Sequence, residues 1–204
     1  MQVPARRRPP NILQIYREPL KPGAEAAYDA LEQQQARVAA SFGCSHPYLG
    51  AEVLSGRKEV WWFNGYTSPA EKQQVYDAYA NNAALMEALQ PNSKAKADLT
   101  LAPVEIFAHY RDDLTIGVPW TIGEGRFLVI TVPSAGRQID GTVFEARDGV
   151  RFVVQSAQTS RDADAARRLA GPEAVVLAVR PAWSFPDETW VASDPVFWAS
   201  RNQS

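Results

Sequence analysis

The stretch that most constrains the fold is Glu59–Tyr66, which reads Glu-Val-Trp-Trp-Phe-Asn-Gly-Tyr. It is dense in aromatic and β-branched residues and is followed by turn formers, so we predict a strand in the middle of a sheet. Because side chains alternate along a strand, Val60, Trp62, Asn64 and Tyr66 share one face, and Glu59, Trp61, Phe63 and Gly65 share the other. Both faces carry large apolar groups, and we therefore expect protein to cover both.

Composition narrows the class of protein. The 204 residues suit one large domain or two of about 100 residues each. A formal net charge of −2 favours neither nucleic acid nor an anionic membrane surface. No stretch approaches the roughly 18 apolar residues of a membrane span. The single cysteine, Cys44, rules out an internal disulfide and fits a reducing compartment, so we expect a cytoplasmic protein in which Cys44 serves packing.

The N-terminus contains the basic cluster Arg6-Arg7-Arg8. No apolar run follows it, so it does not resemble a signal peptide, and we interpret residues 1–10 as a flexible, solvated terminus.

The first half of the chain alternates strand and helix signals. The expected elements are a strand at Asn11–Arg17, a helix of about 20 residues from Ala24 to Gly43, strands at Tyr48–Leu54 and Glu59–Tyr66, a helix that opens at Ser68-Pro69, and a strand at Thr100–Arg111. The spacing of the first helix predicts that Tyr28, Leu31 and Gln35 are buried and that Glu32 faces solvent. In the second helix, Asn81-Asn82 is expected to cause a bend or break, and Asn92–Leu99 is expected to be irregular or a short turn of helix. The order is that of a ferredoxin-like unit over residues 11–111.

The second half, residues 126–186, follows a shorter version of the same order after a linker at 112–125. We expect strands at Arg126–Pro133, Gly141–Arg147, Arg151–Ala157 and Ala174–Trp183, with one helix at Ser160–Ala170 and the other reduced to Ser134–Asp140. From this we infer a degenerate internal duplication. The predicted fold is α+β, with two ferredoxin-like halves whose antiparallel sheets pack face to face. The tail, residues 187–204, keeps three large aromatic residues and is expected to lie across the body or a neighbouring subunit.

The first half is similar to the dimeric α/β-barrel superfamily, which includes antibiotic-biosynthesis monooxygenases, haem-degrading monooxygenases and NIPSNAP-type proteins. The resemblance is carried by Tyr16-Arg17, Lys21-Pro22-Gly23, Glu59–Tyr66, and Asn81 with Leu85, and it is closest to the NIPSNAP pattern. It covers about half of the chain. In that superfamily two such sheets meet across a dimer, and the duplication implies that one chain supplies both. The missing helix of the second half departs from the pattern and puts any site normally built there in doubt.

Polar residues on the predicted strands are the candidate site: Gln14, Glu52, Asn64, Glu105 and His109. One reading is that they satisfy one another's hydrogen bonds between the sheets. The other is a cleft between helices and sheet, lined by aromatic residues with a few convergent polar groups. For this second reading the candidate ligand-binding residues are Trp62, Asn64, Tyr66, Glu105 and His109.

Histidine is the side chain whose charge changes near neutral pH, and His109 is the one histidine on a predicted strand. His46 precedes Pro47 in a connector and is expected to be exposed. The resemblance adds that haem-degrading members use an Asn, a Trp and a His in one pocket. Asn64, Trp62 and His109 are the same residue types.

No Gly-rich phosphate loop, paired metal motif or nucleophile elbow is present, so catalytic residues are not identified, and neither a metal nor a bound cofactor is expected. The leading hypothesis is a NIPSNAP-like protein that binds a small apolar or aromatic molecule. One alternative is a cofactor-independent monooxygenase that uses O₂ and a polar residue as base. The other is a structural assembly module. A homodimer is left open. An open cleft lined by Trp62 and His109 would favour the first two hypotheses, and a filled interior would favour the third.

Overall fold

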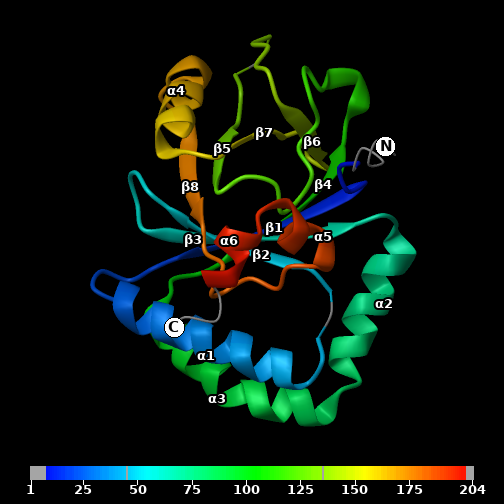
Figure 1. Cartoon of the computed structure of the whole chain (residues 1–204), viewed down its shortest axis with the longest axis vertical. Coiled ribbons are helices and arrows are strands. Elements are labelled where there is room, and N and C mark those ends of the chain that lie inside the picture. The colour runs from blue at the N-terminus through cyan, green and yellow to red at the C-terminus, as the bar shows by residue number, and fades with distance from the viewer. Residues whose placement is uncertain (1–7, 45, 135, 201–204) are drawn as a thin grey trace.

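The computed structural model describes residues 8–44, 46–134 and 136–200, and their strands form one closed antiparallel barrel (Figure 1). The strands are β1 Ile12–Pro19, β2 Tyr48–Val53, β3 Glu59–Tyr66, β4 Val104–Tyr110, β5 Phe127–Thr131, β6 Thr142–Ala146, β7 Arg151–Ala157 and β8 Val175–Val179. The helices are α1 Glu25–Ser41, α2 Pro69–Ala80, α3 Ala83–Leu99, α4 Ser160–Ala170, α5 Glu188–Ser193 and α6 Pro195–Ala199, with a short 3-10 turn, η1, at Asp112–Leu114.

The barrel is closed by hydrogen bonds between the two halves of the chain. The first half contributes strands in the order β4-β1-β3-β2, and the second half contributes β8-β5-β7-β6. The outer strands of the two halves pair in register, with Ala51 opposite Val179 and His109 opposite Glu145. We expected two separate sheets packed face to face. Instead, their edges are joined, which leaves no unpaired edge strand.

The interior of the barrel is filled by side chains. On β3, Trp61 and Phe63 point into the barrel, where they join a continuous apolar cluster with residues of all eight strands. Trp62 and Tyr66 point outward and are also buried, with 2% of each residue exposed. The prediction that both faces of this strand are covered is therefore confirmed. A barrel of eight strands has an interior wide enough either for side chains alone or for one small ligand, and here side chains fill it.

Helices cover the outside of the barrel unevenly. Figure 1 shows α1, α2 and α3 gathered on one side, with α4 apart from them on the second half of the chain. Tyr28 of α1 packs in a cluster with Val60 and Trp62 of β3 and with Trp183. Ala163 and Ala170 of α4 pack on Val129 and Val176. The outer face of the first half thus carries three helices, and that of the second half carries one.

Two expectations about helices need correction, and one is confirmed. Glu32 was expected on the solvent side of α1, but it is 3% exposed because it ion-pairs with Lys96 of α3. Residues 92–99 were expected to be irregular or a short turn of helix, but they are fully helical, since α3 continues through Pro91. The predicted break at Asn81-Asn82 is confirmed, and the Asn82 side chain caps α3 by accepting a hydrogen bond from the Leu85 amide at 3.1 Å.

Segments expected at the periphery contribute to the core. Trp120, from the linker at 112–125, and Trp190 and Trp198, from the tail, are buried in the same cluster as the barrel interior. Pro9 and Pro10 are buried too, while residues 1–7, including Arg6 and Arg7, and residues 201–204 lie outside the described part of the chain. Within the described residues, none of the helices has the length and apolar character that a membrane span requires.

Gly123 allows the tail to pack, and this can be tested. Gly117 and Gly123 both have a left-handed backbone, with φ of +88° and +90°, but a Cβ at Gly117 would meet nothing within 4 Å, whereas one at Gly123 would overlap the Trp190 indole. We expect Gly117→Ala to destabilise the fold by about 1–2 kcal/mol through backbone strain. Gly123→Ala should cost roughly 3 kcal/mol more, because Trp190 must leave the core. Urea unfolding measures both, and equal losses would show that Trp190 does not depend on this glycine.

Candidate functional site

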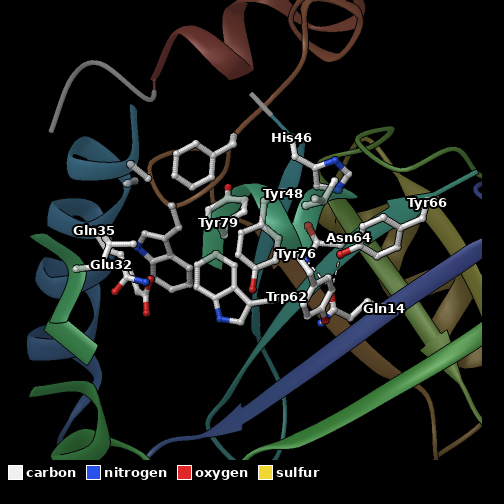
Figure 2. A pocket seen from close by; sticks show the side chains of 16 residues that line it. Gln14, Glu32, Gln35, His46, Tyr48, Trp62, Asn64, Tyr66, Tyr76 and Tyr79 are labelled. Carbon is white, nitrogen blue, oxygen red and sulfur yellow. Dashed lines mark hydrogen bonds between the residues drawn. The ribbon is translucent and has the colours of Figure 1, made fainter. Parts of the chain in front are cut away.

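A cavity of about 250 Å³ lies between the outer face of the first half of the barrel and its helices (Figure 2). Its floor comes from β1, β2 and β3, its walls from α1, α2 and α3, and its remaining side from the connector before β2 and the segment after β8. Seven of its sixteen lining residues are aromatic: Tyr48, Trp62, Tyr66, Tyr76, Tyr79, Trp183 and Phe185. An aromatic-lined hollow with a few polar groups is the usual form of a small-molecule site.

Gln14 organises the polar groups at one end of the cavity. Its amide oxygen accepts hydrogen bonds from Asn64 Nδ2 at 2.8 Å and from the Tyr66 hydroxyl at 2.9 Å. Its amide nitrogen donates to Glu105 Oε1 at 2.6 Å and to the Tyr76 hydroxyl at 2.9 Å. Gln14 therefore fixes the positions of polar side chains from β3, β4 and α2. This agrees with the reading in which the strand polar residues satisfy one another, except that the network lies on the helix side of the sheet.

The structure brings together most of the predicted site residues. Trp62, Asn64 and Tyr66 line the cavity, and Glu105 reaches its edge through the Gln14 network. His109 does not belong with them: it is exposed on β4 and is not among the lining residues. The expected trio of Asn64, Trp62 and His109 therefore does not share a pocket. The helices cover β1, β2 and β3, and the cavity formed beneath them does not extend to the end of β4 where His109 lies.

His46 takes the place expected for His109. It was predicted to be an exposed connector residue, but it is half-buried, lines the cavity and stacks on Tyr66 with ring centroids 5.1 Å apart and an angle of 8° between the ring planes. Burial lowers the pKa of His46 below its usual 6.5, although the nearby Glu71 carboxylate opposes this effect. The ring is therefore neutral at pH 7. The sequence offered one signal that could have found it, the position of His46 two residues before Tyr48, the aromatic residue that begins strand β2.

A second polar cluster lies behind the opposite end of the cavity. Glu18 Oε2 accepts hydrogen bonds from the Tyr28 hydroxyl at 2.6 Å and from Trp62 Nε1 at 2.8 Å, and it lies 2.7 Å from Lys96 Nζ. The same ammonium lies 2.7 Å from Glu32 Oε1, and Glu32 lines the cavity. Burial would lower the pKa of Lys96, but the two carboxylates raise it, so this lysine stays charged.

Polar atoms without partners concentrate at this cavity. Six buried side-chain polar atoms of the described residues lack a hydrogen bond, and three of them belong to lining residues: Glu32 Oε1, Gln35 Oε1 and His46 Nε2. Glu32 Oε1 nevertheless forms an ion pair with Lys96 Nζ at 2.7 Å. Buried polar atoms are normally satisfied, so Gln35 Oε1 and His46 Nε2 are available to a ligand or to water. Figure 2 shows Glu32 and Gln35 at one end and His46 at the other.

No metal centre is indicated. Nowhere in the described part of the chain do three or more His, Cys, Asp or Glu residues gather as metal ligands would.

Comparison with known proteins supports the fold. The sequence matches no protein-family model and no curated protein. A Fusobacterium nucleatum protein, whose name gives monooxygenase as a provisional activity, has a similar structure, with a TM-score of 0.50 and 10% identity over 85% of this chain and 94% of that one. A Lactobacillus acidophilus protein with the same kind of name gives a TM-score of 0.43 and 6% identity over 83% and 92% of the two chains, which is too low to support an argument. The architecture fits the dimeric α/β-barrel fold that the resemblance implied.

The environment of His46 can be tested by titration. Because burial disfavours the charged ring, we expect its NMR proton resonances to titrate with a midpoint below 6.5. The two histidines are distinguished with a His109→Gln variant, which leaves one set of signals. A midpoint above 6.5 would mean that the ring is solvated or paired with a carboxylate, and that it is not a neutral wall of the cavity.

Proposed function

We propose that this protein binds a small, largely aromatic molecule in the cavity between the first half of its barrel and helices α1 to α3. The observation that carries the proposal is the coincidence around one hollow of seven aromatic side chains, two unpartnered buried polar atoms and the buried Glu32 carboxylate. Apolar walls supply affinity through burial, and the polar atoms orient the ligand. Side chains fill the barrel interior, and of the surface hollows this one combines an aromatic lining with unpartnered buried polar atoms.

A pair of neighbouring alanines on α1 tests the proposal. Ala39 is buried and lines the cavity, whereas Ala40 is exposed on the same turn. We expect Ala39→Phe to place its ring in the hollow and to abolish the thermal shift that one- and two-ring aromatic compounds produce in the wild type. Ala40→Phe should leave that shift unchanged. Circular dichroism confirms that both variants fold. If no compound stabilises the wild type, or if Ala39→Phe binds as well as Ala40→Phe, the cavity is not the binding site.

A second candidate function is cofactor-independent monooxygenation, and His46 favours it. A neutral imidazole with a free Nε2 in an aromatic cavity is suited to act as a base. In such a reaction the base removes a proton from an acidic methylene flanked by aromatic rings, and the carbanion reduces O₂ to a peroxide that loses water. One oxygen atom becomes the product ketone and the other leaves as water. The methylene loses four electrons and O₂ takes up four, so no other reductant is needed. The fold shared with a protein named for this activity is compatible with it.

The two histidines provide a matched test of this second function. Anthrone, which has such a methylene, is incubated with the protein, and oxygen uptake is followed with an electrode. We expect uptake above the spontaneous rate, a loss of about 10²-fold or more in His46→Ala, and no change in His109→Ala, because His109 lies outside the cavity. Uptake that equals the spontaneous rate in the wild type, or that survives in His46→Ala, would leave binding as the function.

The proposal also includes the evolutionary origin of the fold and its relationship within the superfamily. The equivalent strand order of the two halves, β4-β1-β3-β2 and β8-β5-β7-β6, supports an origin by internal duplication. Within the superfamily, the sequence pattern at Glu59–Tyr66 favours a NIPSNAP-like relationship. The open cavity speaks for a binding function over a purely structural module, because a module needs no hollow lined by unpartnered polar atoms.

A further inference from the structure

The charges behind the cavity do not balance. Glu18 and Glu32 are 4% and 3% exposed, and both lie 2.7 Å from the one ammonium of Lys96. Counted in their ionised forms, the three side chains leave one negative charge in a buried region. Glu18 also accepts hydrogen bonds from the Tyr28 hydroxyl and the Trp62 indole nitrogen, so its charge is stabilised by neighbouring donors. Glu32 is the carboxyl that lines the cavity, and its Oε1 lacks a hydrogen bond.

The walls next to Glu32 suit a cation. Lys96 Nζ lies 5.4 Å from the centre of the Tyr28 ring and 5.3 Å from that of Trp62, so the aromatic side chains here already surround one positive charge. On the cavity side, Tyr48 stacks on Trp62 at 4.9 Å, and Trp183 lies 6.2 Å from the same ring. Ring faces carry partial negative charge and attract ammonium groups.

No positive charge competes for this position from within the cavity. Among the described lining residues there is no lysine or arginine, and the one that could become positive is His46, which is neutral at pH 7. Figure 2 places His46 at the end of the cavity away from Glu32. The site therefore offers one carboxylate in excess of the ammonium that Glu18 and Glu32 share, together with aromatic ring faces and the unpartnered Gln35 oxygen. Two cations border it from outside the lining: Lys96, which both carboxylates share, and Arg180, which lies over Trp183 and pairs with Asp29 and Glu52.

We propose that the ligand is an organic cation, an aromatic amine or quaternary ammonium compound, whose charged group lies against Glu32 among Tyr48, Trp62 and Trp183. This rests on the proposed binding function and specifies the class of ligand for the same cavity. Cation–π attraction and the excess carboxylate favour the charged molecule over a neutral one of the same shape, which gains only from burial.

We expect a cationic ligand to displace the proton from the Glu32 carboxyl, which makes the affinity for that ligand depend on pH. Burial raises the pKa of Glu32 despite the opposing effect of Lys96, so the empty site holds this carboxyl protonated to a higher pH than an exposed glutamate. The other titratable groups that face it are Glu18 on β1, Tyr28 on α1, Tyr48 on β2 and Lys96 on α3. A cation replaces the proton, so its affinity rises with pH, whereas a neutral ligand has no such dependence.

Two probes of the same shape test the inference. They are para-hydroxyphenyltrimethylammonium and para-tert-butylphenol, which differ in whether the quaternary atom is a charged nitrogen or a neutral carbon. Calorimetry at pH 7 should show the cation bound at least about tenfold more tightly by the wild type. In Glu32→Gln this preference should fall to less than about threefold. In Glu87→Gln, which removes an exposed carboxylate from α3, it should be unchanged.

The outcomes separate this inference from the proposed function. If the neutral phenol binds as well as the cation or better, the cation inference is overturned while the aromatic-binding function stands. If neither probe binds, the inference is overturned, and the compound screen with Ala39→Phe decides the binding function separately. Should Glu32→Gln fail to fold, the wild-type preference and its rise with pH decide alone, because a neutral cavity would show neither.

Discussion

Closure of the barrel by the pairs β2–β8 and β4–β6 is the constraint on which the rest of the structure depends. Each half of the chain alone would expose two edge strands and one apolar sheet face. Joining the edges turns the two apolar faces into one interior, which is filled by side chains from all eight strands and by Trp120, Trp190 and Trp198. The tail and the linker are therefore parts of the core. Because side chains fill this interior, the binding site that we propose lies on the outside of the sheet.

The uneven helix cover decides where on the outside this happens. Three helices lie over the first half. Helix α2 contacts the sheet through polar groups, such as the Tyr76 hydroxyl, which accepts a hydrogen bond from Gln14 of β1. None of the α2 residues is buried, so this helix roofs the cavity without filling it. Over the second half, α4 packs directly on the sheet through alanines and leaves no comparable aromatic hollow. Two halves with a shared strand order thus differ in their helix cover, and the first half carries the aromatic-lined cavity.

Local patterns predicted most of the fold. The alternation in Glu59–Tyr66 gave the correct two-sided burial of β3, and the capping signals at Ser68 and Pro69 gave the start of α2. The boundaries of α4 agree with the expected Ser160–Ala170. Closure could not be predicted, because pairing between β2 and β8 depends on contacts over 120 residues apart in sequence, which no local pattern records. The proposed domain boundaries and the internal duplication remain predictions.

Prediction of the site failed where burial depends on tertiary partners. Glu32 has the spacing of a solvent-facing residue, and only the approach of Lys96 from another helix makes its burial tolerable. His46 lies in a connector, and its stacking on Tyr66 depends on how that connector crosses the end of the sheet. His109, by contrast, is on the expected face of β4, but no helix extends over it. Sequence periodicity identifies faces, whereas the cover over each face is a property of the assembled fold.

The two ends of the cavity differ in a way that bears on chemistry. At the His46 end, the Gln14 network pairs the polar atoms of Asn64 and Tyr66, whereas the imidazole Nε2 is a proton acceptor without a hydrogen-bond partner. At the Glu32 end, the cluster holds an excess of carboxylate over ammonium and is backed by aromatic rings. A ligand with a charged group at the Glu32 end would therefore present its other end to His46. Binding at one end and proton transfer at the other are compatible, and the cationic group would then orient the ligand for any reaction at the histidine.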